Sequence, residues 1–142
     1  MPNIFAPKPG RFGTLPIALP SGRINTGTLA AGTQTHNIGG YAATSIISRA
    51  TICAETFPTA ATSCTLQVFK MTGATALALT AATDINAKTA NVPIPLALTS
   101  TLTDAERTLR VGDSIRIALV TTGSVTVQPD DVTVNVELLV QE

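Results

Sequence analysis

The chain has 142 residues, 44% of them hydrophobic, and its nine Lys and Arg residues balance nine Asp and Glu residues. This length predicts one domain with a substantial core, whereas the charged fraction of 13% is about half the usual share. Four dispersed positive charges near the N-terminus, without a clustered basic face, exclude a nucleic-acid track, and no apolar run reaches the ~18 residues of a membrane-spanning helix. A surface with so few ions is expected to be covered by partners.

Residues 1–24 are predicted to form an extended, Pro-rich N-terminal arm. Proline and glycine recur throughout this segment and exclude a regular helix or a central strand. The arm also carries apolar anchors, and no acidic residue precedes Glu55, so it is positively charged. We expect it to lie along a surface, either that of its own domain or that of a neighbouring subunit. Its candidate partner-binding residues are Phe5, Lys8, Arg11, Phe12 and Arg23.

Residues 25–142 are predicted to form one all-β domain. Short strand candidates, separated by turn residues, alternate along this part of the chain, and no long helical pattern interrupts them. About eight strands with this spacing predict an antiparallel β-sandwich or jelly roll. The candidate strands cover residues 27–31, 43–54, 64–71, 76–80, 92–98, 114–120, 125–127 and 131–140, with breaks expected at Gly32 and at Gly39-Gly40.

The last strand carries the clearest pattern. Side chains alternate between the two sides of a strand, and residues 131–140 alternate strictly between apolar and polar. One face holds Val132, Val134, Val136, Leu138 and Val140, and the other holds Asp131, Thr133, Asn135 and Glu137. One dry face and one wet face predict a strand in an antiparallel sheet that is solvated on one side.

One short helical turn is expected before the strand at residues 114–120. Thr103 and Glu106 have the spacing of a capping box, in which a hydroxyl caps the helix and a carboxylate follows three residues later. Asp113, directly after Gly112, is expected to form a turn.

Residues that support catalysis or metal binding are scarce. His36 is the only histidine, so a cupin-type metal site has too few ligands, and any catalytic triad would have to use His36 itself. Asp130 and Asp131 are neighbours on a predicted strand and point opposite ways, which does not suit a pair of catalytic carboxylates. We therefore expect no enzymatic activity, no cofactor and no metal ion.

The two cysteines, Cys53 and Cys64, lack a nearby histidine or a second cysteine pair, which argues against a zinc site. If their flanking segments form a hairpin, the two thiols would face each other. Because nothing in the chain predicts export, we favour two buried thiols in a reducing compartment over a disulfide.

Three stretches together resemble the small jelly-roll structural proteins of tailed bacteriophages. They are Asp84-Ile85-Asn86, Leu96-Ala97-Leu98-Thr99, and residues 109–117 with the sequence LRVGDSIRI, followed by the alternating valine strand. Among these proteins the chain is most similar to capsid cement, or decoration, proteins, including those of podoviruses that infect Bordetella, over roughly residues 25–142.

This resemblance implies a structural virion protein that binds the outer surface of an icosahedral phage head and bridges major capsid subunits. It implies two partners, the major capsid protein and further copies of this chain as a dimer or trimer, with no nucleic acid or membrane. The protein would then be assembled in the cytoplasm of the bacterial host. The family contributes no catalytic, cofactor-binding or metal-binding residues.

Two other functions remain open on the sequence. A tail or fibre-attachment module of the same fold has the same composition. A carbohydrate-binding or adhesin domain is less favoured, because sugar-binding sandwiches stack aromatic rings on sugars and this chain has no Trp and a single Tyr, Tyr41.

Overall fold

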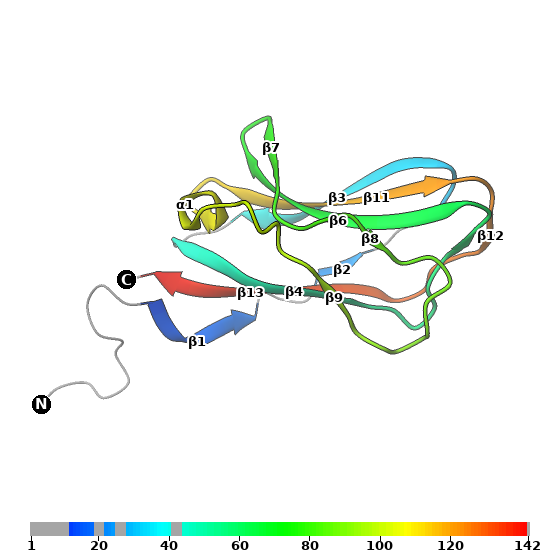
Figure 1. Ribbon diagram of the computed structural model, residues 1–142, viewed down its shortest axis with the longest axis horizontal. Coiled ribbons are helices and arrows are strands. Elements are labelled where there is room, and N and C mark those ends of the chain that lie inside the picture. The colour runs from blue at the N-terminus through cyan, green and yellow to red at the C-terminus, as the bar shows by residue number, and fades with distance from the viewer. Residues whose placement is uncertain (1–11, 19–21, 25–27, 41–43, 142) are drawn as a thin grey trace, which may run out of the picture.

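The computed structural model describes the backbone of residues 12–18, 22–24, 28–40 and 44–141, and the side chains of residues 28–38 and 44–139. Within these residues the chain forms two antiparallel β-sheets that pack face to face, with a single helical turn at one end (Figure 1). We name the two layers after their central strands, the β13 sheet and the β11 sheet.

The β13 sheet has four columns of strands. Both β1 and β2 pair with one side of β13, β4 pairs with its other side, and β9 and β10 pair with the far side of β4. The strands are β1 (Phe12–Ala18), β2 (Gly22–Ile24), β13 (Val132–Gln141), β4 (Ser45–Cys53), β9 (Ile94–Leu96) and β10 (Thr108–Leu109).

The β11 sheet also has four columns. From one edge to the other, β3 pairs with β11, β11 with β6, and β6 with β7 and β8. The strands are β3 (Gly32–Gly40), β11 (Ser114–Thr122), β6 (Ser63–Thr72), β7 (Thr75–Ala78) and β8 (Thr83–Asp84), and a separate small ribbon pairs β5 (Thr59–Ala60) with β12 (Val125–Val127).

The chain moves between the two sheets in a jelly-roll order. When short collinear strands are merged, the two sheets contain eight columns, numbered here in chain order. The first column (β1 and β2) pairs with the last (β13), and the second (β3) pairs with the seventh (β11). These are the long-range pairings of two Greek keys. The structure thus confirms the prediction of an all-β antiparallel sandwich.

Part of the predicted arm belongs to the first column of the β13 sheet. The backbone of residues 12–18 and 22–24 pairs with β13, with Ile17 opposite Leu138 and Arg23 opposite Thr133. The arm was expected to lie along its own domain or along a neighbouring subunit. Residues 12–18 and 22–24 lie along its own domain. Both strands sit at the sheet edge, where a proline such as Pro16 does not interrupt a ladder.

One predicted strand and two predicted breaks were wrong. Of the strand predicted at residues 27–31, residues 28–31 are described and form no strand; the strand β3 instead begins at Gly32 and includes Gly39 and Gly40. The apolar residue that suggested the earlier strand, Leu29, is nevertheless 2% exposed. Its N–H donates to Gln128 Oε1 over 2.7 Å and its carbonyl accepts from Gln128 Nε2 over 3.0 Å, so a side-chain amide replaces the neighbouring strand.

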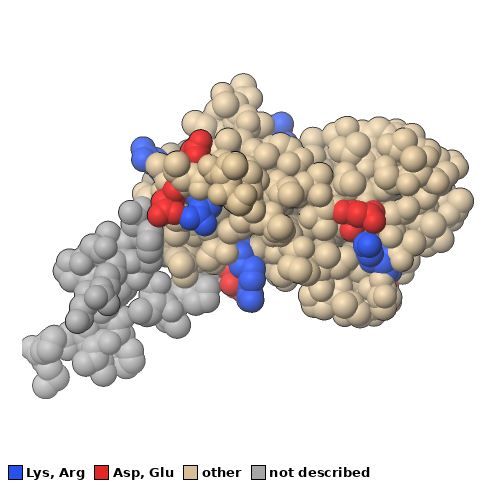
Figure 2. Space-filling view, in the orientation of Figure 1, with Lys and Arg blue, Asp and Glu red and all other residues tan. Residues whose placement is uncertain are grey.

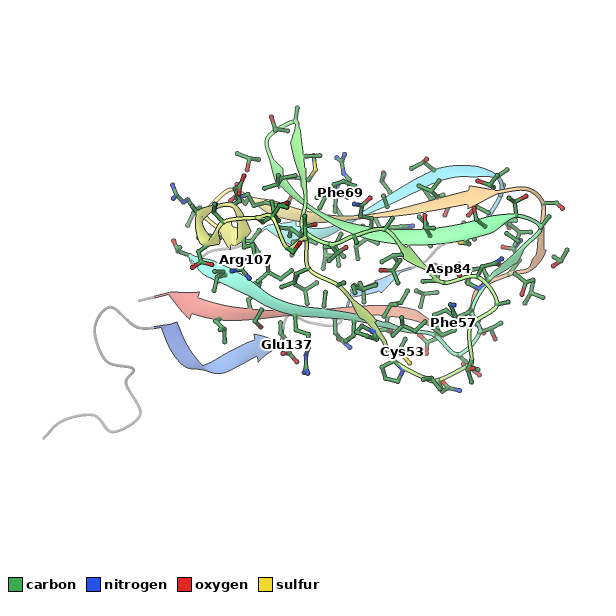
Figure 3. All side chains as sticks on the ribbon, in the orientation of Figure 1. Cys53, Phe57, Phe69, Asp84, Arg107 and Glu137 are labelled. Carbon is green, nitrogen blue, oxygen red and sulfur yellow. The ribbon has the colours of Figure 1, made fainter. Side chains whose placement is uncertain are left out.

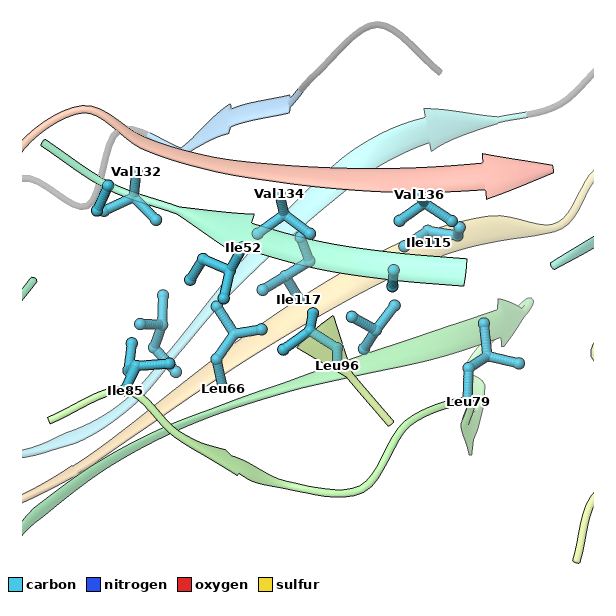
Figure 4. Packing of buried hydrophobic residues seen from close by; sticks show 14 of the residues in the cluster. Ile52, Leu66, Leu79, Ile85, Leu96, Ile115, Ile117, Val132, Val134 and Val136 are labelled. Atoms are coloured by element: carbon cyan, nitrogen blue, oxygen red, sulfur yellow. The ribbon is translucent and has the colours of Figure 1, made fainter. Parts of the chain in front are cut away.

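The core between the sheets is hydrocarbon, contributed mainly by alternate residues of the long strands β4, β6, β11 and β13 (Figure 4). Val132, Val134, Val136 and Leu138 of β13 are buried at 1–2% exposure, as the alternating pattern predicts. Each such side chain contributes about 1.5–3 kcal/mol when removed from water. The opposite wall includes Leu66 and Val68 of β6 and Ile115, Ile117 and Leu119 of β11, all 0% exposed.

The predicted helical turn is present as α1 (Asp104–Arg107), with Thr103 as its N-cap. The Thr103 N–H donates to Glu106 Oε2 over 2.7 Å, and Thr103 Oγ1 accepts from the Glu106 N–H over 3.3 Å. The capping box is therefore complete. Lys70 Nζ donates to the carbonyls of Glu106 and Thr108. Because Lys70 belongs to β6, these bonds connect the end of the helical turn to the β11 sheet.

Candidate interaction surface

The candidate reactive side chains do not gather in the structure. Among the described residues, no three His, Cys, Asp or Glu side chains lie close enough together to hold a metal ion. His36 is half-buried on β3, and burial lowers its pKa below the ordinary value of 6.5. Its Nε2 atom is buried without a hydrogen-bond partner, so no described group orients it as a base.

The two cysteines are free and belong to opposite sheets. Cys53 ends β4 and is half-buried, and Cys64 lies on β6 and is 0% exposed. The hairpin considered for them does not form. Burial raises the pKa of the Cys64 thiol, and the thiol contacts Thr121 Oγ1 at 3.5 Å. A buried thiol with a raised pKa is a poor nucleophile.

Several carboxylates have structural roles. Glu106 completes the capping box, and Asp104 forms an ion pair with Arg107. Asp113 is 6% exposed; its two oxygens accept hydrogen bonds from Thr72 Oγ1 and the Arg110 N–H. The backbone of Asp130 pairs with that of Thr56 in an isolated bridge. Glu106, Asp104 and Asp113 thus serve a helix cap, an ion pair and a turn.

The outward side of the β11 sheet is a described surface with few charged residues. Cross-strand partners share one side of a sheet, so the register arranges the outward residues in rows. We define the outer face as three such rows: Asn37, Arg116, Phe69 and Ala78; then Thr35, Ala118 and Gln67; then Thr33, Val120 and Thr65.

Alternation explains why these residues face outward. On β11 the residues between Arg116, Ala118 and Val120 are buried against the core, and on β6 Leu66 and Val68 are buried between Thr65, Gln67 and Phe69. Phe69 therefore lies on the outward side of the β11 sheet, the upper layer in Figure 3. Glu137 lies on the opposite outer side of the molecule, below the β13 sheet. Val120 is 42% exposed.

Arg116 is the one charged side chain of the outer face. Its Nε donates to Asn37 Oδ1 over 3.3 Å, and among the described residues no carboxylate pairs with it. On the side visible in Figure 2, charged side chains form a few separate groups, and broad uncharged areas lie between them. Interface cores are enriched in aromatic residues and Arg and depleted of Lys, Glu and Asp, and the outer face holds one aromatic residue, one Arg and no Lys, Glu or Asp.

None of the predicted partner-binding residues is among the residues that define the outer face. Phe5, Lys8 and Arg11 are outside the described residues, as is Tyr41, the candidate sugar-stacking residue. Phe12 and Arg23 belong to the backbone of β1 and β2, at the edge of the β13 sheet, and their side chains are not described. Of the five arm residues, the structure therefore places only the backbones of Phe12 and Arg23, and both belong to the β13 sheet and not to the β11 sheet.

Sequence reasoning missed the outer face, although one signal was present. In the segment from Cys64 to Phe69, even-numbered residues are apolar and odd-numbered residues are polar until Phe69, which places an aromatic ring on the wet side. This departure from the alternation shows that the outward side of β6 is not uniformly polar.

No helix among the described residues is long and apolar enough to cross a membrane. Comparison of the chain with protein-family models, with curated proteins and with solved structures finds no match.

Proposed function

We propose that this chain is a structural virion protein, a capsid cement or decoration protein that binds the outer surface of an icosahedral phage head and bridges major capsid subunits. The observation that supports this proposal most is the outer face, a broad and nearly uncharged sheet surface on which Phe69, Val120 and Arg116 are exposed or half-exposed. A surface of this kind suits attachment to another protein.

The chemistry of the outer face specifies the partner surface. Arg116 has free guanidinium donors, so the capsid surface would supply a carboxylate, and hydrogen bonds to charged groups stabilise by about 1.5–3 kcal/mol each. Phe69 and Val120 would cover apolar area beside it. Modest affinity at each site is sufficient, because multivalent attachment to a repeating lattice raises the overall avidity.

The decisive experiment is binding of the purified protein to heads of the phage that encodes it, prepared without this protein. We expect saturable co-sedimentation and, in images of the particles, added density on the outside of the shell. Arg116→Gln is expected to weaken binding about tenfold or more, since a lost charged hydrogen bond costs about 1.5–3 kcal/mol. The matched control is Lys88→Gln, which removes an exposed cation away from the outer face, beside Asp84, and leaves binding unchanged.

Other outcomes would contradict the proposal. Density on the tail instead of the head would favour the tail or fibre-attachment module, and binding to neither would exclude a virion role. The contribution of the arm is tested separately with Phe5→Ser, Lys8→Gln and Arg11→Gln combined. Unchanged head occupancy and unchanged self-association in that variant would contradict a role for the arm.

A further inference from the structure

Within the part of the chain that the structure describes, the strand β3 presents a long unprotected sheet edge. It has nine residues, contains no proline and no charged side chain, and stands at the end of the strand order of the β11 sheet. Among the described residues no strand pairs with its outer side. Soluble proteins normally protect such edges with short strands, proline or charge, because an open row of N–H and C=O groups pairs with other chains.

The other sheet edges of this molecule carry those protections. The edge formed by β9 and β10 consists of strands of three and two residues, and Pro95 lies in the first of them. The edge formed by β7 and β8 has strands of four and two residues. The edge formed by β1 and β2 is divided into two strands, and Pro16, which has no N–H to offer, lies in the first of them. The edge of β3 is the exception.

The hydrogen-bond pattern identifies which groups of β3 are open. The Val68 N–H donates to Thr80 Oγ1 over 3.1 Å and its carbonyl accepts from the Leu79 N–H over 2.8 Å, so both groups of Val68 point away from β11. Hydrogen-bonded and non-bonded pairs alternate in an antiparallel ladder. The residues on either side of Val68, which are Gln67 and Phe69, therefore form the backbone hydrogen bonds to β11.

The same alternation continues from β11 to β3. Ile117, which stands opposite Val68, directs its backbone groups toward its other partner, His36, and Leu119 does the same toward Gln34. The N–H and C=O groups of Thr33, Thr35 and Asn37 therefore point to the open edge. All three residues lie in the regular part of the ladder, from Gly32 to Asn37, and all three side chains are exposed.

We propose that this edge binds the same edge of a second copy of the chain, in antiparallel pairing about a twofold axis. An isologous contact requires a self-complementary strand, and β3 fulfils this requirement because it is uncharged and its open groups repeat at every second residue. Thr35 then lies opposite Thr35 or Asn37 of the second copy. Threonine and asparagine pair favourably across strands, and no like charges meet.

The pairing continues the β11 sheet across both copies. The two outer faces then form one surface, to which each copy contributes an Arg116. Arg116 donates to Asn37, which lies on the edge strand β3, so both arginines stand near the contact between the copies. The dimer forms without any other partner, so it does not depend on the proposed capsid function. Its test uses the isolated full-length chain, and failure of one proposal leaves the other standing.

The experiment compares the mass of the full-length protein in solution, by sedimentation or light scattering, between the wild type and three variants. The wild type is expected to be a dimer. Thr35→Pro removes the open N–H without removing a bond to β11, and Thr35→Lys places a charge near the twofold axis. Each substitution occurs twice in the dimer and is expected to weaken association about tenfold or more. Thr35→Ser keeps the backbone donor and the hydroxyl, and is expected to leave the dimer intact.

Hydrogen exchange provides a second measurement that requires no substitution. Relative to dilute monomer, the dimer is expected to protect the amides of Thr33, Thr35 and Asn37, and not those of β7. A monomeric wild type at high concentration would overturn the proposal. So would a dimer that persists in folded Thr35→Lys protein, or one that leaves these three amides unprotected.

Discussion

Asp113 shows how a single carboxylate connects separate parts of the sandwich. It lies in the turn between β10 and β11 and is 6% exposed. One oxygen accepts from Thr72 Oγ1 over 2.8 Å, at the end of β6, and the other accepts from the Arg110 N–H over 2.9 Å, which closes the turn. A buried polar group of this kind is tolerated because its oxygens are hydrogen-bonded.

Asp113→Ala is expected to lower the free energy of unfolding by about 2–3 kcal/mol, because two donors lose a charged acceptor. Thr72→Val, which removes one of the two donors, is expected to cost about 1 kcal/mol. Urea unfolding of both variants measures the difference. Equal costs would show that the bond to the Arg110 N–H contributes nothing to stability.

At the level of the element, the turn from β11 to β12 depends on a glycine. Gly123 has φ +84°, a left-handed conformation that L side chains rarely adopt. A Cβ built there would lie 2.9 Å from the Ala61 Cβ and 3.2 Å from the Thr62 backbone nitrogen. This close approach accompanies backbone bonds from the Ala61 N–H to the Ser124 carbonyl and from the Thr62 N–H to the Thr122 carbonyl. The turn and the loop beside β5 are therefore held together at this glycine.

Gly123→Ala is expected to destabilise the protein by more than the ~1–2 kcal/mol of left-handed strain alone, since the added methyl group also meets Ala61. The matched control is Gly73→Ala in the turn between β6 and β7. Gly73 has φ +60° but nothing within 4 Å of its Cβ position, so only the backbone strain applies. Thermal unfolding ranks the two variants, and an equal or smaller loss for Gly123→Ala would contradict the steric argument.

For the whole molecule, the stability of the sandwich is linked to pH through His36. Burial disfavours the imidazolium and lowers the pKa of His36 below 6.5, so the unfolded chain binds a proton more readily than the folded one. Stability then reaches its full value above pH 6.5 and falls as the pH drops below 6.5 toward the folded-state pKa. His36→Gln is expected to flatten this part of the curve.

Glu106→Gln provides the control for that pH profile. Hydrogen bonds from the Thr103 backbone and hydroxyl hold the pKa of Glu106 below 4.5, so its contribution is lost only as the pH falls below 4.5. Chemical denaturation across the pH range separates the two windows. Identical slopes just below pH 6.5 in the wild type and in His36→Gln would contradict the assignment to His36.

Local patterns determined much of this fold from the sequence. The alternation in residues 132–138, the capping box of Thr103 and Glu106, and the strand-and-turn spacing between residues 43 and 127 depend on neighbours in the chain, and the structure confirms them. Two-layer burial follows from that alternation, because each strand must bury its dry side.

Only the tertiary structure decided the remaining features, because they depend on partners distant in the sequence. Gly32, Gly39 and Gly40 favour a turn locally, yet pairing with β11 holds all three within the span of β3. Leu29 packs into the core cluster, and the side-chain amide of Gln128, 99 residues away, bonds to its backbone. Likewise, Asn37, Arg116 and Phe69 become neighbours only through the register of three strands, and the open edge of β3 exists only because the sheet ends there.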